Sequence, residues 1–339
     1  MKKLERKLSL PSVIAISIAG MLGSGIFVLP GIAAAKTGSS IWLAYLIAAI
    51  CILPAALSKS ELATAMPKSG GSYVYIERAL GPLFGTISGI GLWLSLLLKS
   101  SFALVGFGAY LLVLTNIPSE EVDTYMKYFS IGFLTLIMFL NIFGVKKVGK
   151  IQLVIVILSL LTLLSILFLG LPKVDMQLTQ FMTNGTMGLI STVAFVYISY
   201  AGVTKIAAIA GEVKNPSRNI PLAMLLSLLV ISSLYVSIAY TLVGNVHLDI
   251  LKDDIKPIHT LAALLGGEWF AYGVAIIGVI TLISMANSGV LASSRFPFAM
   301  AMDKLLPSNL AKLHNKHLTP INAILLTCLM MALIILFLD

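Results

Sequence analysis

Nine long apolar stretches constrain the fold of this chain more than any other feature. A transmembrane helix needs about 20 mostly apolar residues, and the first stretch holds no ionisable side chain between residues 13 and 35. Only 11% of the 339 residues are charged and 58% are hydrophobic, whereas soluble domains carry about 25% charged residues. The sequence therefore predicts an all-α integral membrane protein and excludes a soluble enzyme. The predicted spans are 12–35, 41–58, 83–114, 126–144, 150–170, 187–211, 221–244, 269–300 and 319–338.

The residues that usually form metal or redox sites are few and badly placed for one. Cys51 and Cys328 lie inside apolar stretches, and the four histidines lie between such stretches. A disulfide framework and a thiolate metal cluster are therefore not expected. No glycine-rich phosphate loop occurs either, so we expect neither a cofactor nor pumping driven by ATP.

The distribution of lysine and arginine predicts the orientation of the spans. These residues concentrate before residue 12 and in the segments 59–82, 145–150, 212–220 and 301–318. Short cytoplasmic loops carry the excess of positive charge, so the amino terminus is predicted to be cytoplasmic, in the cell membrane. The net charge of +9 then reflects topology and attraction to the anionic lipid bilayer, and nucleic acid is not an expected partner.

Two spans carry residues that favour a break in the helix. Gly23 and Gly25 bracket Ser24 in the middle of the first span, and the sixth span carries a weaker signal at 197–204. Small residues can also serve close helix packing. However, interrupted helices at equivalent places in two halves are typical of transporter sites. We therefore predict a first repeat over 12–170 and a second repeat over 185–339, which five spans per repeat would place in inverted orientation.

Two such breaks would bring free amides and free carbonyls together at mid-membrane. Free amides lie at the positive, amino-terminal end of a helix, and free carbonyls lie at the negative, carboxyl-terminal end. The two kinds of helix end together therefore suit a zwitterion such as an amino acid. A carboxylate would bind the amides of Ser24, Gly25 and Ile26. An ammonium would bind the carbonyls of Met21, Ile198 and Ala201 at the other helix ends. We add the aromatic residue and the glycine of the second break as further candidates. The predicted substrate-binding residues are then Met21, Ser24, Gly25, Ile26, Ile198, Tyr200, Ala201 and Gly202. Tyr200 could instead serve packing alone.

Four motifs resemble one family of transporters. They are GSGIFVLPG in the first span, ELATAMPKSGGSYVYIERALGPLFG after the second, EVKNPSRNIP after the sixth and SRFPFAMAMDKLLP after the eighth. Together they resemble the amino acid–polyamine–organocation superfamily from residue 10 to the end of the chain. The resemblance implies a leucine-transporter-like fold of inverted repeats and secondary amino acid transport by alternating access. Family members have at least ten spans in the shared core, so nine spans imply an incomplete second repeat, either in a fragment or in a truncated permease.

One charged side chain in the third span is a candidate for coupling transport to a cation. Lys99 is far from both ends of its span, and an ionisable residue inside the membrane is a functional hypothesis by default. Its titration would couple transport to a proton. Some relatives place a membrane lysine in the fifth helix, where this chain has Ser159, so a direct transfer of that role is weakened. A sodium site could instead use Ser284, Asn287 and Ser288, although such residues also bond neighbouring helices together.

Lys205, at the start of the inner half of the sixth span, is the second membrane lysine. It could snorkel to the surface, line the inward vestibule, meet a substrate carboxylate or pair with another group. The sequence leaves these alternatives open.

The leading prediction is a cation-coupled secondary transporter of amino acids. Apolar residues such as Ile18, Met21, Ile198 and Val203 favour a neutral or hydrophobic substrate. A membrane sensor that binds an amino acid without moving it is one alternative, and an amino acid antiporter is another. A polyamine carrier would need acidic residues at mid-membrane, and the spans hold none there.

Overall fold

The structure, a computed structural model, describes residues 5–114, 121–143, 145–179, 185–252, 254–314 and 317–337. The predicted span ends at 144 and 338 lie outside these residues. The elements, α-helices (α) and 3₁₀ helices (η), are in chain order α1 Leu10–Met21, α2 Ser24–Phe27, α3 Leu29–Thr37, η1 Gly38–Ser40, α4 Ile41–Ala65, α5 Ser72–Leu80, α6 Pro82–Leu114, α7 Val122–Ile142, α8 Val145–Gly170, η2 Leu171–Lys173, α9 Gly185–Tyr197, η3 Ile198–Thr204, α10 Lys205–Ala208, η4 Ala210–Glu212, α11 Pro216–Asn245, α12 Leu248–Leu251, α13 Pro257–Ser293, α14 Arg295–Met302, η5 Ser308–Ala311 and α15 Ile321–Phe337.

The described helices agree with the predicted membrane protein. Eight of them are long and apolar enough to cross a membrane, and α15 is a shorter apolar helix of 17 residues at the ninth predicted place. Residue 267 marks a kink inside α13, because Gly267 has a φ of 77° there. The apolar span predicted to begin at 269 therefore starts directly after the kink.

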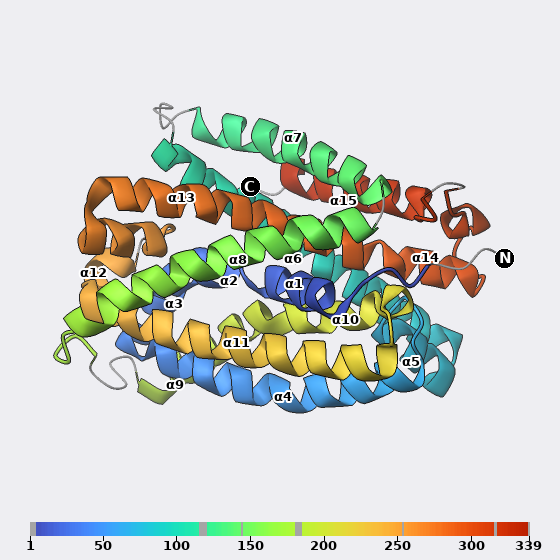
Figure 1. The fold of residues 1–339 in the computed structure, drawn as a ribbon, viewed down its shortest axis with the longest axis horizontal. Coiled ribbons are helices and arrows are strands. Elements are labelled where there is room, and N and C mark those ends of the chain that lie inside the picture. The colour runs from blue at the N-terminus through green and yellow to red at the C-terminus, as the bar shows by residue number, and fades with distance from the viewer. Residues whose placement is uncertain are drawn as a thin grey trace.

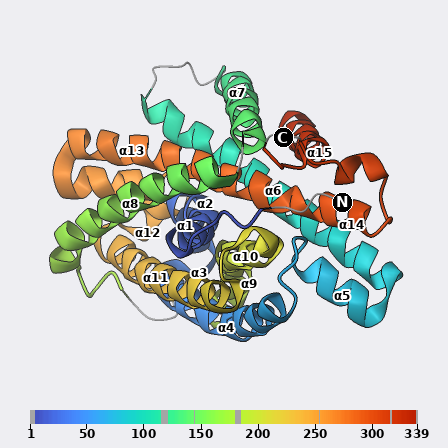
Figure 2. The ribbon, with the colours of Figure 1, turned by 45° about the vertical axis from the view of Figure 1, so that its right-hand side comes forward.

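The long helices form two groups on either side of α1 and α2. In Figure 1, α4, α9 and α11 lie together along one side, and α7 and α15 lie on the opposite side. The helix α13 packs along α6 between these groups, and α8 contacts both α1 and α13. Figure 2 shows the same arrangement after rotation, with α1 enclosed by the other helices. The first span is therefore the centre of the bundle.

The burial pattern is consistent with a lipid environment outside the bundle and a packed interior. Large apolar side chains such as Ile50, Leu229 and Phe168 are exposed, as the lipid-facing side of a membrane helix requires. In contrast, Val13, Ile16 and the other core residues of α1 are fully buried. Most of the first span is thus shielded from both water and lipid.

The first span is broken between α1 and α2. Gly23 has a φ of 118° and a ψ of −127°, a conformation that only glycine adopts without strain. A Cβ atom at this position would also lie 2.6 Å from the Met285 sulfur. Glycine is therefore required at Gly23 both for the turn and for the approach of α13.

The sixth span changes its helical geometry without such a turn. It runs as α9, then as the 3₁₀ helix η3 over seven residues, and then as α10. Its flanking residues Tyr197 and Lys205 keep right-handed helical angles. The predicted second break is therefore a tightened stretch of helix, and a new α-helix, α10, starts at Lys205.

Candidate functional site

The first break presents the amino-terminal end of α2 to the interior of the bundle. The Ile26 and Phe27 amides donate to the Gly23 carbonyl at 3.2 Å and 2.9 Å. Ser24 and Gly25 precede the first hydrogen-bonded amide of α2, and such amides have no partner within their own helix. The Ile26 amide, predicted to bind a carboxylate, is therefore already engaged, whereas those of Ser24 and Gly25 remain the candidates.

The three carbonyls predicted to bind an ammonium each accept a hydrogen bond from a side chain. Tyr235 Oη donates to the Met21 carbonyl at 2.6 Å, and Lys99 Nζ donates to the Ile198 carbonyl at the same distance. The Ala201 carbonyl accepts from its local neighbour Thr204 at 2.8 Å. These carbonyls thus attract donors, and one of the donors is itself an ammonium.

Three tyrosines fill the space beside the first break. Tyr45 Oη donates to the Gly25 carbonyl at 2.5 Å, and Tyr200 Oη donates to the Tyr45 carbonyl at 3.0 Å. The ring centroids of Tyr45 and Tyr235 lie 5.2 Å apart, and those of Tyr200 and Tyr235 lie 5.4 Å apart. All three side chains are fully buried. They join α4, η3 and α11 to the break.

Gly25 leaves only a small space between these side chains. A Cβ atom there would lie 2.5 Å from Tyr235 Oη and 3.0 Å from the Ser199 Cβ. The first break and η3 therefore face each other directly across Gly25. A side chain at this position would therefore meet Tyr235 and Ser199.

Gly202 has a packing role at this contact. A Cβ atom on Gly202 would lie 2.5 Å from both the Gly20 oxygen and the Met21 nitrogen. The backbone of η3 consequently touches the end of α1. Ala201 lies on another side of η3, where it lines a cavity of about 140 Å³ together with Lys59 and Tyr197.

Lys99 and Lys205 are both buried close to the breaks. Lys99 is 6% exposed, and besides the Ile198 carbonyl its ammonium reaches the Ser199 carbonyl at 3.3 Å. Lys205 is 1% exposed, and its Nζ has no hydrogen-bond partner. Of the alternatives that the sequence left open for Lys205, the burial excludes snorkelling to the surface.

The residues proposed as sodium ligands form hydrogen bonds with neighbouring helices. Asn287 Oδ1 accepts from Asn141 at 2.7 Å, and Ser288 Oγ donates to the Ile16 carbonyl at 2.9 Å. The Ser284 carbonyl accepts from Gln152 at 2.9 Å, while its hydroxyl oxygen is buried without a partner. These contacts join α13 to α1, α7 and α8.

Ser159, at the position where some relatives have a membrane lysine, belongs to the same set of interhelical contacts. Its hydroxyl lies 2.6 Å from the Thr281 hydroxyl of α13. It thus connects α8 to α13 as a neutral partner.

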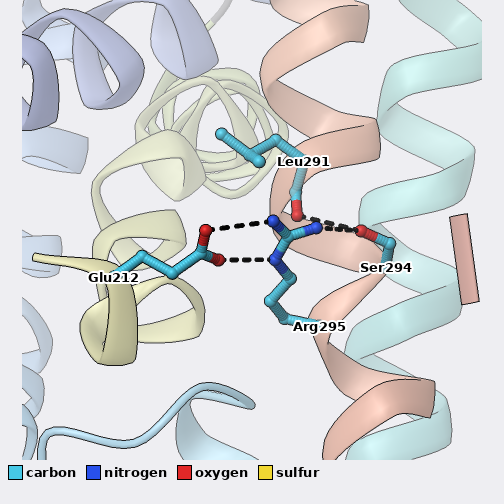
Figure 3. A network of polar contacts seen from close by, with 4 residues as sticks. All are labelled: Glu212, Leu291, Ser294 and Arg295. Atoms are coloured by element: carbon cyan, nitrogen blue, oxygen red, sulfur yellow. Dashed lines mark hydrogen bonds and ion pairs between the residues drawn. The ribbon is translucent and has the colours of Figure 1, made fainter. Parts of the chain in front are cut away.

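An ion pair closes one end of the site. Glu212 of η4 accepts from Arg295 Nε at 2.7 Å and from its Nη2 at 3.2 Å, and both side chains are buried (Figure 3). Arg295 Nη1 also donates to Ser294 Oγ at 2.8 Å. The Leu8 amide donates to the Glu212 carbonyl at 2.9 Å. The end of the sixth span, the start of α14 and the amino-terminal segment are thereby held together.

An aromatic contact closes the opposite side. Tyr110 Oη of α6 donates to the Phe27 carbonyl at 2.5 Å, and the two rings pack edge to face at 5.7 Å. The ion pair, bonded to Leu8 before α1, and the aromatic contact, at Phe27 after the turn, thus lie beyond opposite ends of the first break.

Sequence reasoning missed several residues that meet the predicted ones. Tyr45, Tyr235, Ser199 and Gln152 all contact predicted backbone or side-chain atoms. A tyrosine in the middle of an otherwise apolar span was the available signal for Tyr45 and Tyr235, because a buried hydroxyl needs a partner.

The amino acid permease family model matches residues 8–338 of the chain. The chain belongs to the amino acid permease family. The match includes both breaks, the two membrane lysines and the ion pair, so all the features described above lie within the family's common region.

Relatives and a solved structure agree with this assignment. The chain is 29% identical to the branched-chain amino acid permease BcaP of Bacillus subtilis over 94% of its own length and 72% of the relative's length. It is 27% identical to the serine/threonine exchanger SteT of the same organism over 94% of this chain and 73% of the exchanger. The crystal structure of MhsT in complex with L-phenylalanine superposes with a TM-score of 0.70 at 16% identity, covering 98% of this chain and 79% of MhsT. This likeness shows that the fold is that of the leucine-transporter-like proteins, as predicted.

Proposed function

We propose that this member of the permease family is a secondary transporter that moves amino acids across the cell membrane by alternating access. The proposal unites the family assignment with the geometry of the first break. The relatives named above are a permease and an exchanger, and the neighbouring structure holds an amino acid.

The observation that carries the proposal is the break at Gly23. The Ser24 and Gly25 amides begin a helix, where they offer a positive dipole end to a carboxylate. The carbonyls of Met21 and Ile198, on the other side of the site, attract the donors Tyr235 and Lys99. A substrate ammonium would use the same carbonyls, so binding would release at least one of these side chains. Ser24, Gly25, Met21, Ile198 and Ala201 are the substrate-binding residues of this proposal, with Tyr200 and Gly202 shaping the site.

Alternating access requires that the two ends of the site open in turn. The Glu212–Arg295 pair and the Tyr110–Phe27 contact are on opposite sides of the breaks. With the amino terminus in the cytoplasm, Glu212 and Arg295 close the cytoplasmic end. The repeats 12–170 and 185–339 would supply the symmetry through which one end opens while the other closes.

Coupling to a cation is the finer part of the proposal. Proton coupling would use Lys99, because loss of its proton would weaken its hold on the Ile198 and Ser199 carbonyls. Sodium coupling would use Ser284, Asn287 and Ser288, whose oxygens would have to exchange their present partners for the ion. The existing bonds of Asn287 and Ser288 favour the proton.

Counterflow in vesicles tests the proposed function. The purified chain is reconstituted into liposomes that are loaded with unlabelled amino acids, and uptake of labelled amino acid is followed. Accumulation that depends on the internal amino acid is expected from a transporter. Binding in a thermal-shift assay without any counterflow would contradict transport and indicate a sensor. A cation gradient should also drive uptake into vesicles that hold no amino acid; counterflow without this uptake would identify an antiporter, as SteT's name as an exchanger suggests for that relative.

A further inference from the structure

Lys205 is a buried lysine whose side-chain nitrogen has no hydrogen-bond partner, at the place where α10 packs against α1 and α13. It is the first residue of α10, and its Nζ has no hydrogen bond although the residue is 1% exposed. A buried ammonium normally pairs with an acidic group, because removing its charge from water is costly. An unpaired one next to a candidate binding site therefore calls for a ligand.

The side chain of Lys205 points toward the end of α1. A Cβ atom placed on Gly20 would lie 2.8 Å from Lys205 Cδ and 3.2 Å from its Nζ, and one placed on Gly289 of α13 would lie 3.7 Å from Nζ. Lys205 thus extends between two glycines, one on each helix. Gly20 directly precedes Met21, so the ammonium lies beside the proposed substrate site.

No buried acidic side chain that the structure describes is free to neutralise this charge. Among the described residues, Glu212 is the one buried acidic side chain, and it pairs with Arg295. Lys99 adds a second positive charge, and its ammonium already bonds two carbonyls. The region around the breaks consequently lacks negative charge.

We propose that Lys205 binds a second carboxylate of the substrate, and that the chain takes amino acids with a net negative charge. The inference rests on the proposed function and names its substrate class. The α-carboxylate of such a substrate would bind the Ser24 and Gly25 amides, while its side-chain carboxylate would bind the Lys205 ammonium.

The charge of Lys205 should affect the substrate preference more than the apolar residues near the breaks do. Ile198 and Val203 offer surface to any side chain, and that contact discriminates little between substrates of similar size. An ammonium left unpaired in a dry site instead gains a partner only from a substrate that carries a second negative charge. Two buried lysines also exclude cationic amino acids and polyamines, because like charges repel strongly at low dielectric.

Glutamate and glutamine form the sharpest pair of probes, because they have nearly the same shape and differ in charge. We expect the reconstituted wild-type chain to bind and exchange glutamate with about 10- to 100-fold higher affinity than glutamine, the range for a hydrogen bond to a charged group. In Lys205→Met, this preference should fall to about threefold or less, while the affinity for glutamine changes little. Equal affinities in the wild type, or a preference for glutamine or leucine over glutamate, would overturn the inference and leave the proposed function intact.

Thermal stability separates a binding role from a structural one. Removal of an unpaired buried charge should leave the ligand-free Lys205→Met variant at least as stable as the wild type, and glutamate should stabilise only the wild type. Lys150→Met, at an exposed lysine of α8, is the matched control and should keep the full stabilisation by glutamate. A large loss of stability in ligand-free Lys205→Met would contradict an unpaired ammonium. Binding and exchange of no amino acid at all by the wild type would instead refute the proposed function itself.

Discussion

The first and sixth spans interrupt their helices in different ways. The first turns sharply at Gly23, where φ is 118°, so that a new helix begins at Ser24. The sixth passes through the seven-residue 3₁₀ helix η3, in which the Lys205 amide still bonds the Gly202 carbonyl. The first span therefore creates a helix amino terminus in the interior, whereas the sixth keeps its backbone paired.

The difference teaches that the two sides of the proposed site need different sequences. Amides can be exposed only by starting a helix anew, which here requires a glycine in a conformation closed to other residues. Carbonyls have a second lone pair and can accept another donor while their helix continues. Lys99 uses the Ile198 carbonyl in this way.

Substitution of Gly23 should have the largest effect on transport and stability, because it disrupts the sharper of the two breaks. Gly23→Ala forces a side chain into a conformation that costs about 1–3 kcal/mol, and its Cβ would meet Met285 at 2.6 Å. We expect counterflow to be lost and the thermal midpoint of the ligand-free protein to fall. Gly81→Ala is the matched control, since Gly81 also has a positive φ of 87° but open space around it. The control should lose stability while transport persists; transport by Gly23→Ala at the level of Gly81→Ala would contradict a required turn at Gly23.

The second prediction concerns the space between the two breaks. Gly25→Val should abolish substrate binding, because even a Cβ atom there lies 2.5 Å from Tyr235 Oη. Gly25→Ala should weaken binding less, and Tyr235→Phe in the same chain should restore part of it by removing the hydroxyl. Isothermal titration on the single and double variants measures this coupling. Normal affinity in Gly25→Val would show that the substrate binds elsewhere.

The third prediction concerns the contact of Lys99 with the second break and its role in the pH dependence of uptake. Lys99→Met frees the Ile198 and Ser199 carbonyls of their ammonium, so uptake should lose its dependence on external pH while the protein still expresses. Uptake is measured in liposomes between pH 5 and 8, the range commonly used for proton-coupled chemistry of side chains. Asn287→Ala is the comparison for sodium and should leave the pH profile as in the wild type. An unchanged profile in Lys99→Met would remove the proton role of this residue.

The smallest effects are expected from the tyrosines at the first break. Tyr45→Phe and Tyr235→Phe each remove one hydroxyl that bonds a carbonyl of the break, at Gly25 and Met21 respectively. Each loss should cost about 1 kcal/mol of stability. Only Tyr235→Phe should also change substrate affinity, because the Met21 carbonyl belongs to the proposed ammonium site. Equal effects of both variants on affinity would mean that these tyrosines act through packing alone.

Much of the fold followed from local patterns in the sequence. Apolar length fixed the spans, and Gly23 and Gly25 around a serine identified the first break, because these signals need no knowledge of distant residues. The sixth span was harder: it has the single Gly202 where the first span has two glycines around a serine, so the sequence could not distinguish an open break from the 3₁₀ helix η3. The engagement of the Ile26 amide by Gly23 is likewise a detail of turn geometry.

The hydrogen-bond partners of the predicted site residues were less predictable, because they come from segments that are distant in the sequence. Tyr235 meets Met21, and Gln152 meets the Ser284 carbonyl, across more than 100 residues of sequence in each case. Lys99 could be predicted as a buried charge but not as a donor to η3. The burial of Lys205 without a partner, which leads to the inferred substrate class, required the packed structure around Gly20 and Gly289.

The most direct test of the central claim replaces one backbone amide by an ester. Introducing glycolic acid in place of Gly25 removes the N–H group proposed to bind the substrate carboxylate and leaves the side chains unchanged. We expect the substrate affinity to fall by about tenfold or more. The corresponding ester at Ile26, whose amide bonds Gly23, should lower stability with little effect on affinity. Unchanged substrate affinity with the ester at Gly25 would contradict the claim that the first break binds the carboxylate.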